Sequence, residues 1–547
     1  MRSLIPLSLL LAVLDTPVYG LRVPFEVRIV DAPSTSLARR ATPIPISNTG
    51  NAQYISNVTL GGTTLPLLLD TGSSDLWVHF PSTVPSGTTD TGDSLSLSYA
   101  VGKVAGNVHT TKVQFGDYSV DNQAFLLVED TSTFTSDIHA QGYDGLLGLG
   151  PNGGSQIRKK LDKDTGDSLL THIFEQDNTT ENYITFLLDR KGDSTDPFTG
   201  QFTIGEVVPG FENVTSMPKL DVETVQKILE ADQHWQALTD KDNGIIGPDG
   251  QAIKLKSIVP KAPSGQFVAV IDSGFTFSQV PRDVSDAIYG RVRGAVYDTK
   301  NEYWTIPCGQ LLNLTFMFGG KPYPVHPLDV VDNNFSKTDA NGKRVCIGAF
   351  QPITSAFSVL GHYDMILGMS FLRNAYTLLD FGDWIDDTKD QGHPYIQMTS
   401  LLDVPAARRD FIQIRLGGND TTGDEQWSLL PVDQMQKSPV SEEEKKKLYQ
   451  EMILSRWPYI LIGCLAFLVL VAGLCIWKCC CRKKTKKTKS QMGIFKGKAE
   501  SSAYLPLQEP HRHHGTGAYP PPQYGFQPTH GDYGSGGQGY NGNHSHA

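Results

Sequence analysis

The stretch "LLLDTGSSDLWV", residues 67–78, places a single carboxylate, Asp70, at the end of an apolar run. An aspartate in such a place is usually a turn-former or a helix cap, because its side chain readily bonds nearby backbone N–H groups. The chain repeats the arrangement far downstream in "FVAVIDSGFTFSQVP", residues 267–281, where a second apolar run ends on Asp272. Two copies of one unusual arrangement need a common explanation, which decides the fold.

Each half of the chain adds a second motif after its aspartate. The first half contains "YDGLLGLG", residues 143–150, and the second contains "MILGMSFL", residues 365–372. Because glycine permits close backbone approach, the recurring apolar-apolar-Gly pattern indicates two tight loops that meet. Short β-rich runs separated by Gly, Asn and Asp turns lie between these motifs, so we expect an all-β fold with a few short helices, one of them at 282–293.

These paired motifs resemble those of the pepsin-like aspartic peptidases, over roughly residues 50–400. The resemblance implies two β-lobes related by a pseudo-twofold axis, each delivering one aspartate to the floor of a cleft. Asp70 and Asp272 would then activate a water molecule between them, one as a base and the other as a proton donor to the scissile peptide. The implied enzyme is an aspartic endopeptidase that needs no metal, cofactor or covalent intermediate.

The resemblance also implies supporting residues around the two aspartates. Hydroxyl groups brace the two loops across the axis, backbone N–H groups face the carboxylates, and a serine hydroxyl bonds the first aspartate. A flap hairpin, matched by "LSYAVGKVAG" at residues 97–106, covers the substrate, and a tryptophan supports its tyrosine. In that order, these residues are Thr71 and Ser273, Gly72 and Gly274, Ser73, Tyr99 and Gly102 of the flap, and Trp77.

The second motif departs from the family pattern. Phe275 stands where relatives commonly carry Ser or Thr, and Met369 stands where they often carry Asp. Losing a hydrogen bond to the charged form and adding apolar surface both disfavour ionisation. We therefore predict that Asp272 carries the shared proton more often than Asp70. The alternative is that Thr276, or a bound water, replaces the missing donor.

The N-terminal sequence predicts a secreted precursor. Residues 1–20 read as a signal peptide, with a buried first strand as the alternative. Residues 21–40 read as a propeptide that is cut after Arg40, the second residue of the dibasic pair Arg39-Arg40. The alternative is that the two arginines lie on a flexible arm that is not cut. The two lobes are then expected at 41–200 and 201–400.

The C-terminal region predicts a membrane anchor. Residues 457–478 carry no charge before the final lysine and have aromatic residues near both ends, a pattern typical of a transmembrane helix. The basic run that follows places the positive side after the helix, so we expect a single-pass type I protein of the cell surface or secretory pathway with its catalytic domain extracellular or lumenal. Residues 401–456 are predicted as a stalk, and residues 479–547 as a disordered cytoplasmic tail.

Cysteines and glycosylation sequons agree with an oxidising, secretory compartment. Cys308 and Cys346 are the two cysteines of the expected lumenal region, and we expect them to form a disulfide, with two buried free thiols as the alternative. The cysteines at 479–481 are candidates for palmitoylation, and the alternative is that they lie beside the membrane by chance. Glycosylation is expected at Asn57, Asn178, Asn213, Asn313, Asn334 and Asn419.

Composition and motifs bear on other functions. The net charge is −11 although residues 478–498 are strongly basic, so the remaining surface is acidic and argues against nucleic-acid binding. No G-x-S-x-G elbow supports a serine peptidase, and the His-rich residues 511–515 are a weak candidate for metal. We expect a monomer that acts on protein or peptide substrates. The competing hypothesis is a catalytically inactive pepsin-like fold that serves as a surface binding or receptor module.

Overall fold

The computed structural model describes most of the chain in two units. The described residues are 21–24, 26–27, 52–99, 102–131, 134, 137–161, 163–176, 181–191, 200–225, 233–339, 342–353, 362–385, 392–440 and 442–481. Contacts between residues separate the chain up to Lys445 from a second unit that begins at Lys446. The first unit contains the folded lobes, and the second contains the apolar C-terminal helix.

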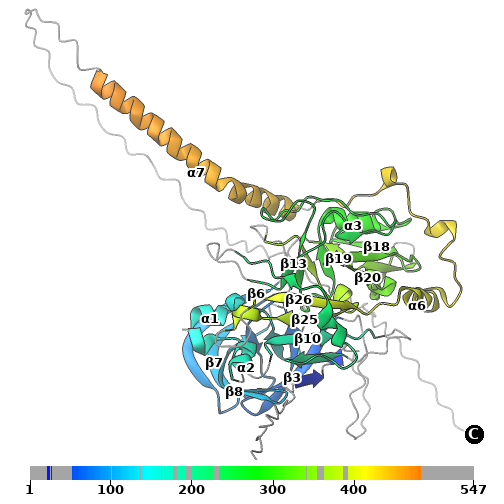
Figure 1. The fold of residues 1–547 in the computed structure, drawn as a ribbon, viewed down its shortest axis with the longest axis horizontal. Helices are drawn as coiled ribbons and strands as arrows, with labels where there is room; N and C mark the ends of the chain where they lie inside the picture. The colour runs from blue at the N-terminus through cyan, green and yellow to red at the C-terminus, as the bar shows by residue number, and fades with distance from the viewer. Residues whose placement is uncertain are drawn as a thin grey trace, which may run out of the picture. The chain divides into compact units, whose positions relative to one another are not determined.

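The first lobe is built on an eight-stranded sheet with the order β2-β3-β4-β9-β5-β8-β7-β6. Figure 1 labels four of its strands, β3, β6, β7 and β8. Side chains alternate between buried and more exposed positions along strands such as β3, as expected for a sheet with one face in the core. The strands are β2 (Glu26–Val27), β3 (Tyr54–Leu60), β4 (Thr63–Asp70), β5 (Leu76–Val78), β6 (Thr89–Tyr99), β7 (Gly102–Phe115), β8 (Tyr118–Asp130) and β9 (Gly145–Gly148).

A six-stranded sheet joins the two halves of the chain, with the order β1-β11-β10-β25-β26-β12. Its central contact pairs β10 from the first half with β25 from the second, antiparallel, with Phe186 opposite Thr377. The strands are β1 (Leu21–Pro24), β10 (Tyr183–Leu187), β11 (Gln201–Ile204), β12 (Leu220–Asp221), β25 (Ala375–Asp380) and β26 (Tyr395–Ser400). The lobes therefore share one layer of backbone hydrogen bonds.

The second lobe consists of three smaller sheets with the orders β13-β15-β24-β16-β23, β14-β19-β20 and β17-β18-β22-β21. The first sheet contains β13 (Gln236–Leu238), β15 (Val268–Ile271), β16 (Ser278–Val280), β23 (Phe350–Pro352) and β24 (Met365–Leu367). The other two contain β14 (Ile245–Ile246), β17 (Val296–Asp298), β18 (Tyr303–Pro307), β19 (Leu314–Phe318), β20 (Lys321–Val325), β21 (Val331–Thr338) and β22 (Arg344–Gly348). The expected all-β, bilobal architecture is confirmed.

Short helices fill the edges of the lobes. The helix expected at 282–293 is present as α3 but ends at Tyr289, where Gly290 caps it through a hydrogen bond from its backbone N–H to the Asp286 carbonyl. The helices of the lobes, α3 included, are α1 (Gln156–Lys160), α2 (Leu169–Gln176), α3 (Arg282–Tyr289), α4 (Pro327–Val330), α5 (Met369–Leu372) and α6 (Val404–Leu416). The 3₁₀ turns are Asn152–Gly154, Lys163–Gly166, Glu212–Ser216, Gly382–Trp384, Glu425–Trp427 and Val432–Gln434.

Part of the segment predicted as a propeptide pairs with the lobes. Strand β1 lies antiparallel to β11 at the edge of the six-stranded sheet, and β2 lies antiparallel to β3. Arg40 and the predicted signal peptide lie outside the described residues. The described part of residues 21–40 thus extends two sheets.

Much of the segment predicted as a stalk packs on the second lobe instead. Helix α6 begins at a cap from Asp403, whose carboxylate accepts the Ala406 N–H, and it buries Phe411 completely. Farther along, the Ser438 hydroxyl donates to Asp286 of α3 at 2.6 Å. The stalk interpretation is therefore wrong for residues 401–445, because distant polar partners anchor a segment whose own sequence is polar.

The last described element is the long helix α7 (Glu442–Cys481). Its residues Tyr459–Lys478 form the one candidate membrane span among the described residues, and their described side chains are exposed. Twenty helical residues extend about 30 Å, which is the thickness of a bilayer's hydrocarbon core. By length and composition this helix fits the expected membrane anchor.

Candidate active site

Two parallel strand pairs bring the two aspartates to equivalent places. In the first lobe β4 runs parallel to β9 with Asp70 opposite Gly148. In the second lobe β15 runs parallel to β24, and the Asp272 N–H donates to the Leu367 carbonyl at 3.1 Å. Each aspartate therefore lies where a buried strand emerges beside the apolar-apolar-Gly motif of its own lobe.

The glycines of those motifs leave room for the loops after the aspartates. A Cβ on Gly148 would lie 2.5 Å from the backbone nitrogen of Asp75. A Cβ on Gly368 would lie 2.3 Å from the Phe275 carbonyl oxygen. Real Cβ atoms do not approach backbone so closely, so the recurring glycine is required by packing against the aspartate loop.

The two carboxylates meet across the lobes. The Gly72 N–H donates to Asp70 at 2.8 Å, and the Gly274 N–H donates to Asp272 at 2.7 Å. A Cβ on Gly72 would lie 2.2 Å from the Asp272 carboxylate, and a Cβ on Gly274 would lie 2.5 Å from the Asp70 carboxylate. Each glycine thus bonds its own aspartate and leaves space for the opposite one.

A reciprocal set of buried hydrogen bonds locks the two loops together. The Thr71 hydroxyl donates to the Ile271 carbonyl at 2.9 Å and accepts the Ser273 N–H at 2.9 Å. The Ser273 hydroxyl donates to the Leu69 carbonyl at 2.9 Å and accepts the Thr71 N–H at 3.1 Å. The brace across the axis has the geometry that the sequence resemblance implied.

The surroundings of the two aspartates differ. The Ser73 hydroxyl donates to Asp70 at 2.5 Å, whereas Phe275 at the matching position packs with an apolar cluster. The Thr276 hydroxyl donates to the Ala52 carbonyl at 3.0 Å, so it is not the replacement donor for Asp272. Burial and the neighbouring Asp70 raise the pKa of Asp272 well above its ordinary value, against the hydrogen bond from the Gly274 N–H.

A β-hairpin carries the expected flap residues. Strands β6 and β7 pair up to Tyr99 opposite Gly102, and the tip between them lies outside the described residues. The Tyr99 ring lies 6.4 Å from that of Trp77, between centroids, and Phe134 stacks on Trp77 at 5.9 Å. Burial, and the charges of Asp75 and Asp70, raise the pKa of Tyr99, which keeps its phenol neutral.

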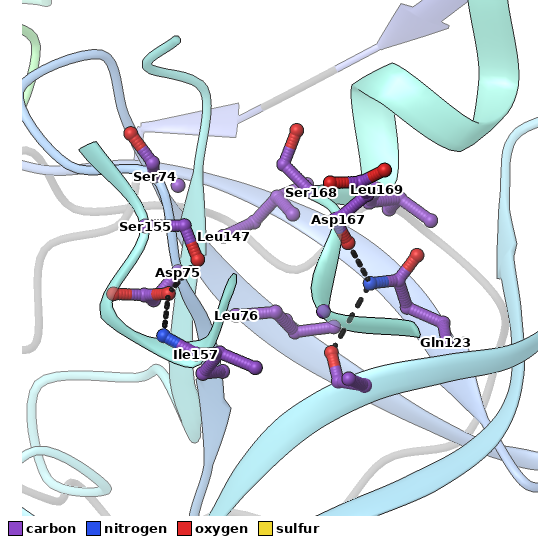
Figure 2. A pocket seen from close by; sticks show the side chains of 13 residues that line it. Ser74, Asp75, Leu76, Gln123, Leu147, Ser155, Ile157, Asp167, Ser168 and Leu169 are labelled. Atoms are coloured by element: carbon purple, nitrogen blue, oxygen red, sulfur yellow. Dashed lines mark hydrogen bonds between the residues drawn. The ribbon is translucent and has the colours of Figure 1, made fainter. Parts of the chain in front are cut away.

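Asp75 is a supporting residue that the sequence motifs did not single out. Its buried carboxylate accepts the Ser155 hydroxyl at 2.6 Å and the backbone N–H groups of Gln156 and Ile157 at 2.9 and 3.0 Å. Figure 2 shows the bonds from Ser155 and Ile157 beside a small polar cavity of about 10 Å³, which has room for about one water. An acid three residues beyond the D-T-G tripeptide, within "DTGSSD", was the available signal.

His234 is a second residue near the site that no sequence motif indicated. Its Nδ1 lies 3.1 Å from the Gly72 carbonyl oxygen, so an imidazole from the second half of the chain contacts the first aspartate loop. The sequence around His234 contains no pattern that marks it.

The remaining expected sites have mixed outcomes. The disulfide between Cys308 and Cys346 is confirmed, and no cluster among the described residues could hold a metal ion. The His-rich residues 511–515, the cysteines at 479–481 as modification sites and Asn178 are not tested by the described structure. The predicted acceptors Asn57, Asn213, Asn313, Asn334 and Asn419 are exposed, and their glycosylation remains a prediction.

Comparisons with known proteins agree with this geometry. The family model described as eukaryotic aspartyl protease matches residues 53–384. The chain is similar to vacuolar protease A of Neurospora crassa, with 25% identity over 365 residues that cover 62% of this chain and 79% of the relative. It is also similar to penicillopepsin-2 of Penicillium janthinellum, with 27% identity over 374 residues that cover 66% and 82%. Among solved structures, the aspartic proteinase from Irpex lacteus has the same fold, with a TM-score of 0.51, 20% identity and coverage of 71% of this chain and 100% of that one.

Proposed function

The chain belongs to the eukaryotic aspartyl protease family, and from this premise we propose that it hydrolyses peptide bonds by activating water between Asp70 and Asp272. The observation that carries the proposal is the crossed arrangement of the two loops, in which each glycine bonds one aspartate and leaves space for the other. Two carboxylates so close cannot both ionise cheaply, so the pair holds one proton.

The different surroundings of the two aspartates support different roles in this mechanism. Hydrogen bonds from Ser73 and Gly72 stabilise negative charge on Asp70, while burial and Asp70 itself favour the protonated form of Asp272. Asp70 then removes a proton from the water as its oxygen attacks the scissile carbonyl carbon, and Asp272 gives its proton to the carbonyl oxygen. In the second half, the tetrahedral intermediate collapses and the C–N bond breaks. The proton held by Asp70 passes to the leaving nitrogen, and one hydroxyl of the intermediate returns a proton to Asp272 as the new carboxyl group forms.

The flap supplies a neutral hydrogen-bonding group above the acids. Because the pKa of Tyr99 is raised, its hydroxyl keeps its proton across the working range of an acid peptidase. Trp77 packs against this tyrosine, and Phe134 stacks on the Trp77 ring, so the positions of the Tyr99 ring are limited. We assign Tyr99, Gly102 and Trp77 to the closing of the cleft over a bound peptide.

The apolar helix supports attachment of the enzyme to a membrane. We propose that Tyr459–Lys478 crosses a bilayer once, with the peptidase on the extracellular or lumenal side and residues 479–547 in the cytoplasm. No acid or base interrupts the span before Lys478, so the helix tethers and does not catalyse. The signal peptide over 1–20, the cut after Arg40, and the glycosylation are part of the same proposal.

The activity is tested on residues 41–445, because the segment after 401 packs on the second lobe. The purified protein, incubated with a peptide library from pH 3 to 7, should cleave internal peptide bonds. Asp70→Asn and Asp272→Asn should each lower kcat by at least about 10³-fold, since each removes a group acting in proton transfer. Full activity in either variant would refute the two-aspartate mechanism.

The second candidate function, an inactive binding module, has its own outcome in this test. A folded, correctly processed protein that cleaves no peptide at any pH would favour it. Comparison of residues 41–445 with the full-length chain in detergent tests the tether, because simple anchoring predicts equal turnover on short peptides.

A further inference from the structure

A histidine lies directly across the strand ladder from the second aspartate. Strands β13 and β15 are antiparallel, and their register continues past their ends because the Ile271 N–H donates to the Trp235 carbonyl at 2.7 Å. The next residues along each chain are His234 and Asp272. The imidazole Nδ1 of His234 lies 3.1 Å from the Gly72 carbonyl oxygen, so its position is set from both lobes.

A second histidine, His362, belongs to the segment that contacts the first. His362 and Tyr363 precede β24, and the Tyr363 ring meets the His234 ring edge-on at 5.9 Å between centroids. The Gln236 side chain reaches the His362 carbonyl at 3.4 Å, which ties this segment to β13. Burial, and then the neighbouring His234, lower the pKa of His362.

The surface next to this pair is apolar. Val270, Ile353 and Ile366 form a buried cluster, and Phe275 and Tyr363 pack against it while remaining partly exposed. A substrate side chain entering here would place its carbon atoms on this cluster and its tip at the imidazoles. A tip that carries negative charge would stabilise both imidazoles in their protonated form, because it offsets their mutual repulsion.

Acidic groups also lie on the segments packed around the pair. Among the described residues these are Asp70 and Asp272 of the dyad, Glu223 on the segment that bonds β13, and Asp364 beside Tyr363. Burial raises the pKa of both Glu223 and Asp364, and hydrogen bonds, led by one from the Val268 N–H, oppose the rise at Asp364. Tyr363 stays neutral because burial and Asp272 raise its pKa.

We propose that His234 and His362 form a specificity site that binds an acidic side chain of the peptide substrate, Glu or Asp, next to Asp272. The proposal rests on the peptidase function proposed above and names its substrate class. The side chain's carboxylate accepts charge-assisted hydrogen bonds from the two imidazolium groups, and its methylene groups lie on the apolar cluster. No covalent step is involved.

Peptide pairs that differ only by Glu or Gln test the site on the full-length chain in detergent. The pairs scan three positions on each side of the scissile bond at pH 5. At one position the Glu peptide should have a kcat/KM about tenfold higher than its Gln partner, the gain expected for a charged hydrogen-bonded pair. A ratio near one at every position would overturn the proposal.

Three variants identify the residues responsible. His234→Asn keeps a donor for the Gly72 carbonyl but cannot become a cation, and His362→Gln removes the second cation. Each should bring the Glu-to-Gln ratio close to one. His393→Asn changes a histidine whose side chain is 86% exposed, and it should leave the ratio unchanged. Retention of the full ratio in both His234→Asn and His362→Gln would refute the assignment.

The pH dependence of the ratio is a separate readout. The substrate carboxylate ionises above about pH 4.3, and an imidazole of ordinary pKa is charged below about pH 6.5. The lowered pKa of His362 moves the upper limit of its charged form below that value. The ratio should therefore be largest between these values. It should fall at lower pH as the substrate is protonated and at higher pH as the imidazoles lose their protons. A ratio constant from pH 3.5 to 7 would contradict binding by imidazolium.

Binding to an inactive variant separates this site from the catalytic proposal. Asp70→Asn is mixed with the same fluorescent peptides and their dissociation constants are measured by anisotropy. Tighter binding of the Glu peptide without cleavage by the unaltered enzyme would uphold the site and refute the peptidase. Cleavage by the unaltered enzyme with equal binding and equal rates for both peptides would uphold the peptidase and refute the site.

Discussion

The first and second aspartate loops have the same backbone arrangement, but they differ in the side chains around the acid. Both loops present a glycine N–H to their own aspartate, and both exchange hydroxyl bonds with the opposite loop. The first adds the Ser73 hydroxyl, whereas the second places Phe275 in the matching position and turns Thr276 toward Ala52. A duplicated backbone brings the acids together symmetrically, and neighbouring side chains make them unequal.

The loops are also anchored by different chemistry. In the first lobe the Asp75 carboxylate accepts three hydrogen bonds from residues at the start of α1. In the second lobe the hydroxyls of Ser278 and Ser370 bond each other at 2.8 Å, and the Gly368 N–H donates to Ser278 at 3.1 Å. One lobe thus relies on a buried charge and the other on neutral groups, which predicts different responses to mutation.

The largest expected effect comes from the charges that join the halves. Asp329 is buried and accepts hydrogen bonds from Arg190 at 2.9 Å and from Arg373 at 2.9 Å. Asp329→Asn leaves these arginines without their counter-charge, so the free energy of unfolding should fall by about 3–5 kcal/mol in urea denaturation at pH 6. A loss below about 1 kcal/mol would show that the halves are held together by the shared sheet alone.

The pH dependence of this network has a defined sign. Burial raises the pKa of Asp329, but the charges of Arg190 and Arg373 outweigh it and hold the pKa well below the ordinary range. A depressed pKa contributes stability that is present above the unfolded value of about 3.9 and is lost as the pH falls toward the folded value. The gap in stability between the unaltered protein and Asp329→Asn should therefore shrink only below about pH 4.

The next effect concerns the two glycines between the acids. Gly72→Ala and Gly274→Ala should each lower kcat by about 10²-fold or more, because a Cβ would displace the opposite carboxylate. Gly72→Ala should be the more harmful, since its Cβ would come closer, 2.2 Å against 2.5 Å. Gly87→Ala, where a Cβ meets nothing within 4 Å, is the matched control. Equal activity of all three variants would refute the crossed geometry.

A smaller effect distinguishes the two anchors. Asp75→Asn should lower the free energy of unfolding by about 2–3 kcal/mol, because its new amide group faces donors, whereas Ser278→Ala should cost about 1 kcal/mol. Denaturation in urea measures both, and kcat shows whether each loop keeps its shape. The contrast between a charged and a neutral anchor fails if Ser278→Ala costs as much as Asp75→Asn.

The smallest effect tests the asymmetry of the acids. Phe275→Thr offers a hydroxyl to Asp272, which stabilises its charged form and lowers its pKa, so the basic limb of the pH–rate profile should move down by about 0.5–1 unit. Phe275→Leu adds no donor and should leave the limb in place. A limb that stays or moves upward in Phe275→Thr would contradict our assignment of the proton to Asp272.

Local sequence was enough to predict the aspartate loops and the elements with a strong composition. In each loop an apolar strand, an acid, a hydroxyl residue and a glycine occupy consecutive positions. The conformation of Asp70–Gly72 and of Asp272–Gly274 can therefore be predicted from neighbouring residues alone. The downstream glycines were recognisable because a side chain there would collide with backbone. The disulfide followed from two isolated cysteines, and the apolar helix from twenty residues without a charge before its end.

The contacts between distant segments could be read only from the tertiary structure. The segment 401–445 was predicted to be a stalk because it is polar. In the structure the Ser438 hydroxyl donates to Asp286, and Arg282 Nε donates to Glu444 at 3.0 Å. Each bond joins residues more than a hundred positions apart in the sequence.

His234 lies opposite Asp272 only because of the register between β13 and β15, and a slip of one residue would turn it to the other face. The sequence by itself therefore determined which acids this protein presents. Strand pairing decided which side chains surround them, because a register joins residues that no local pattern connects.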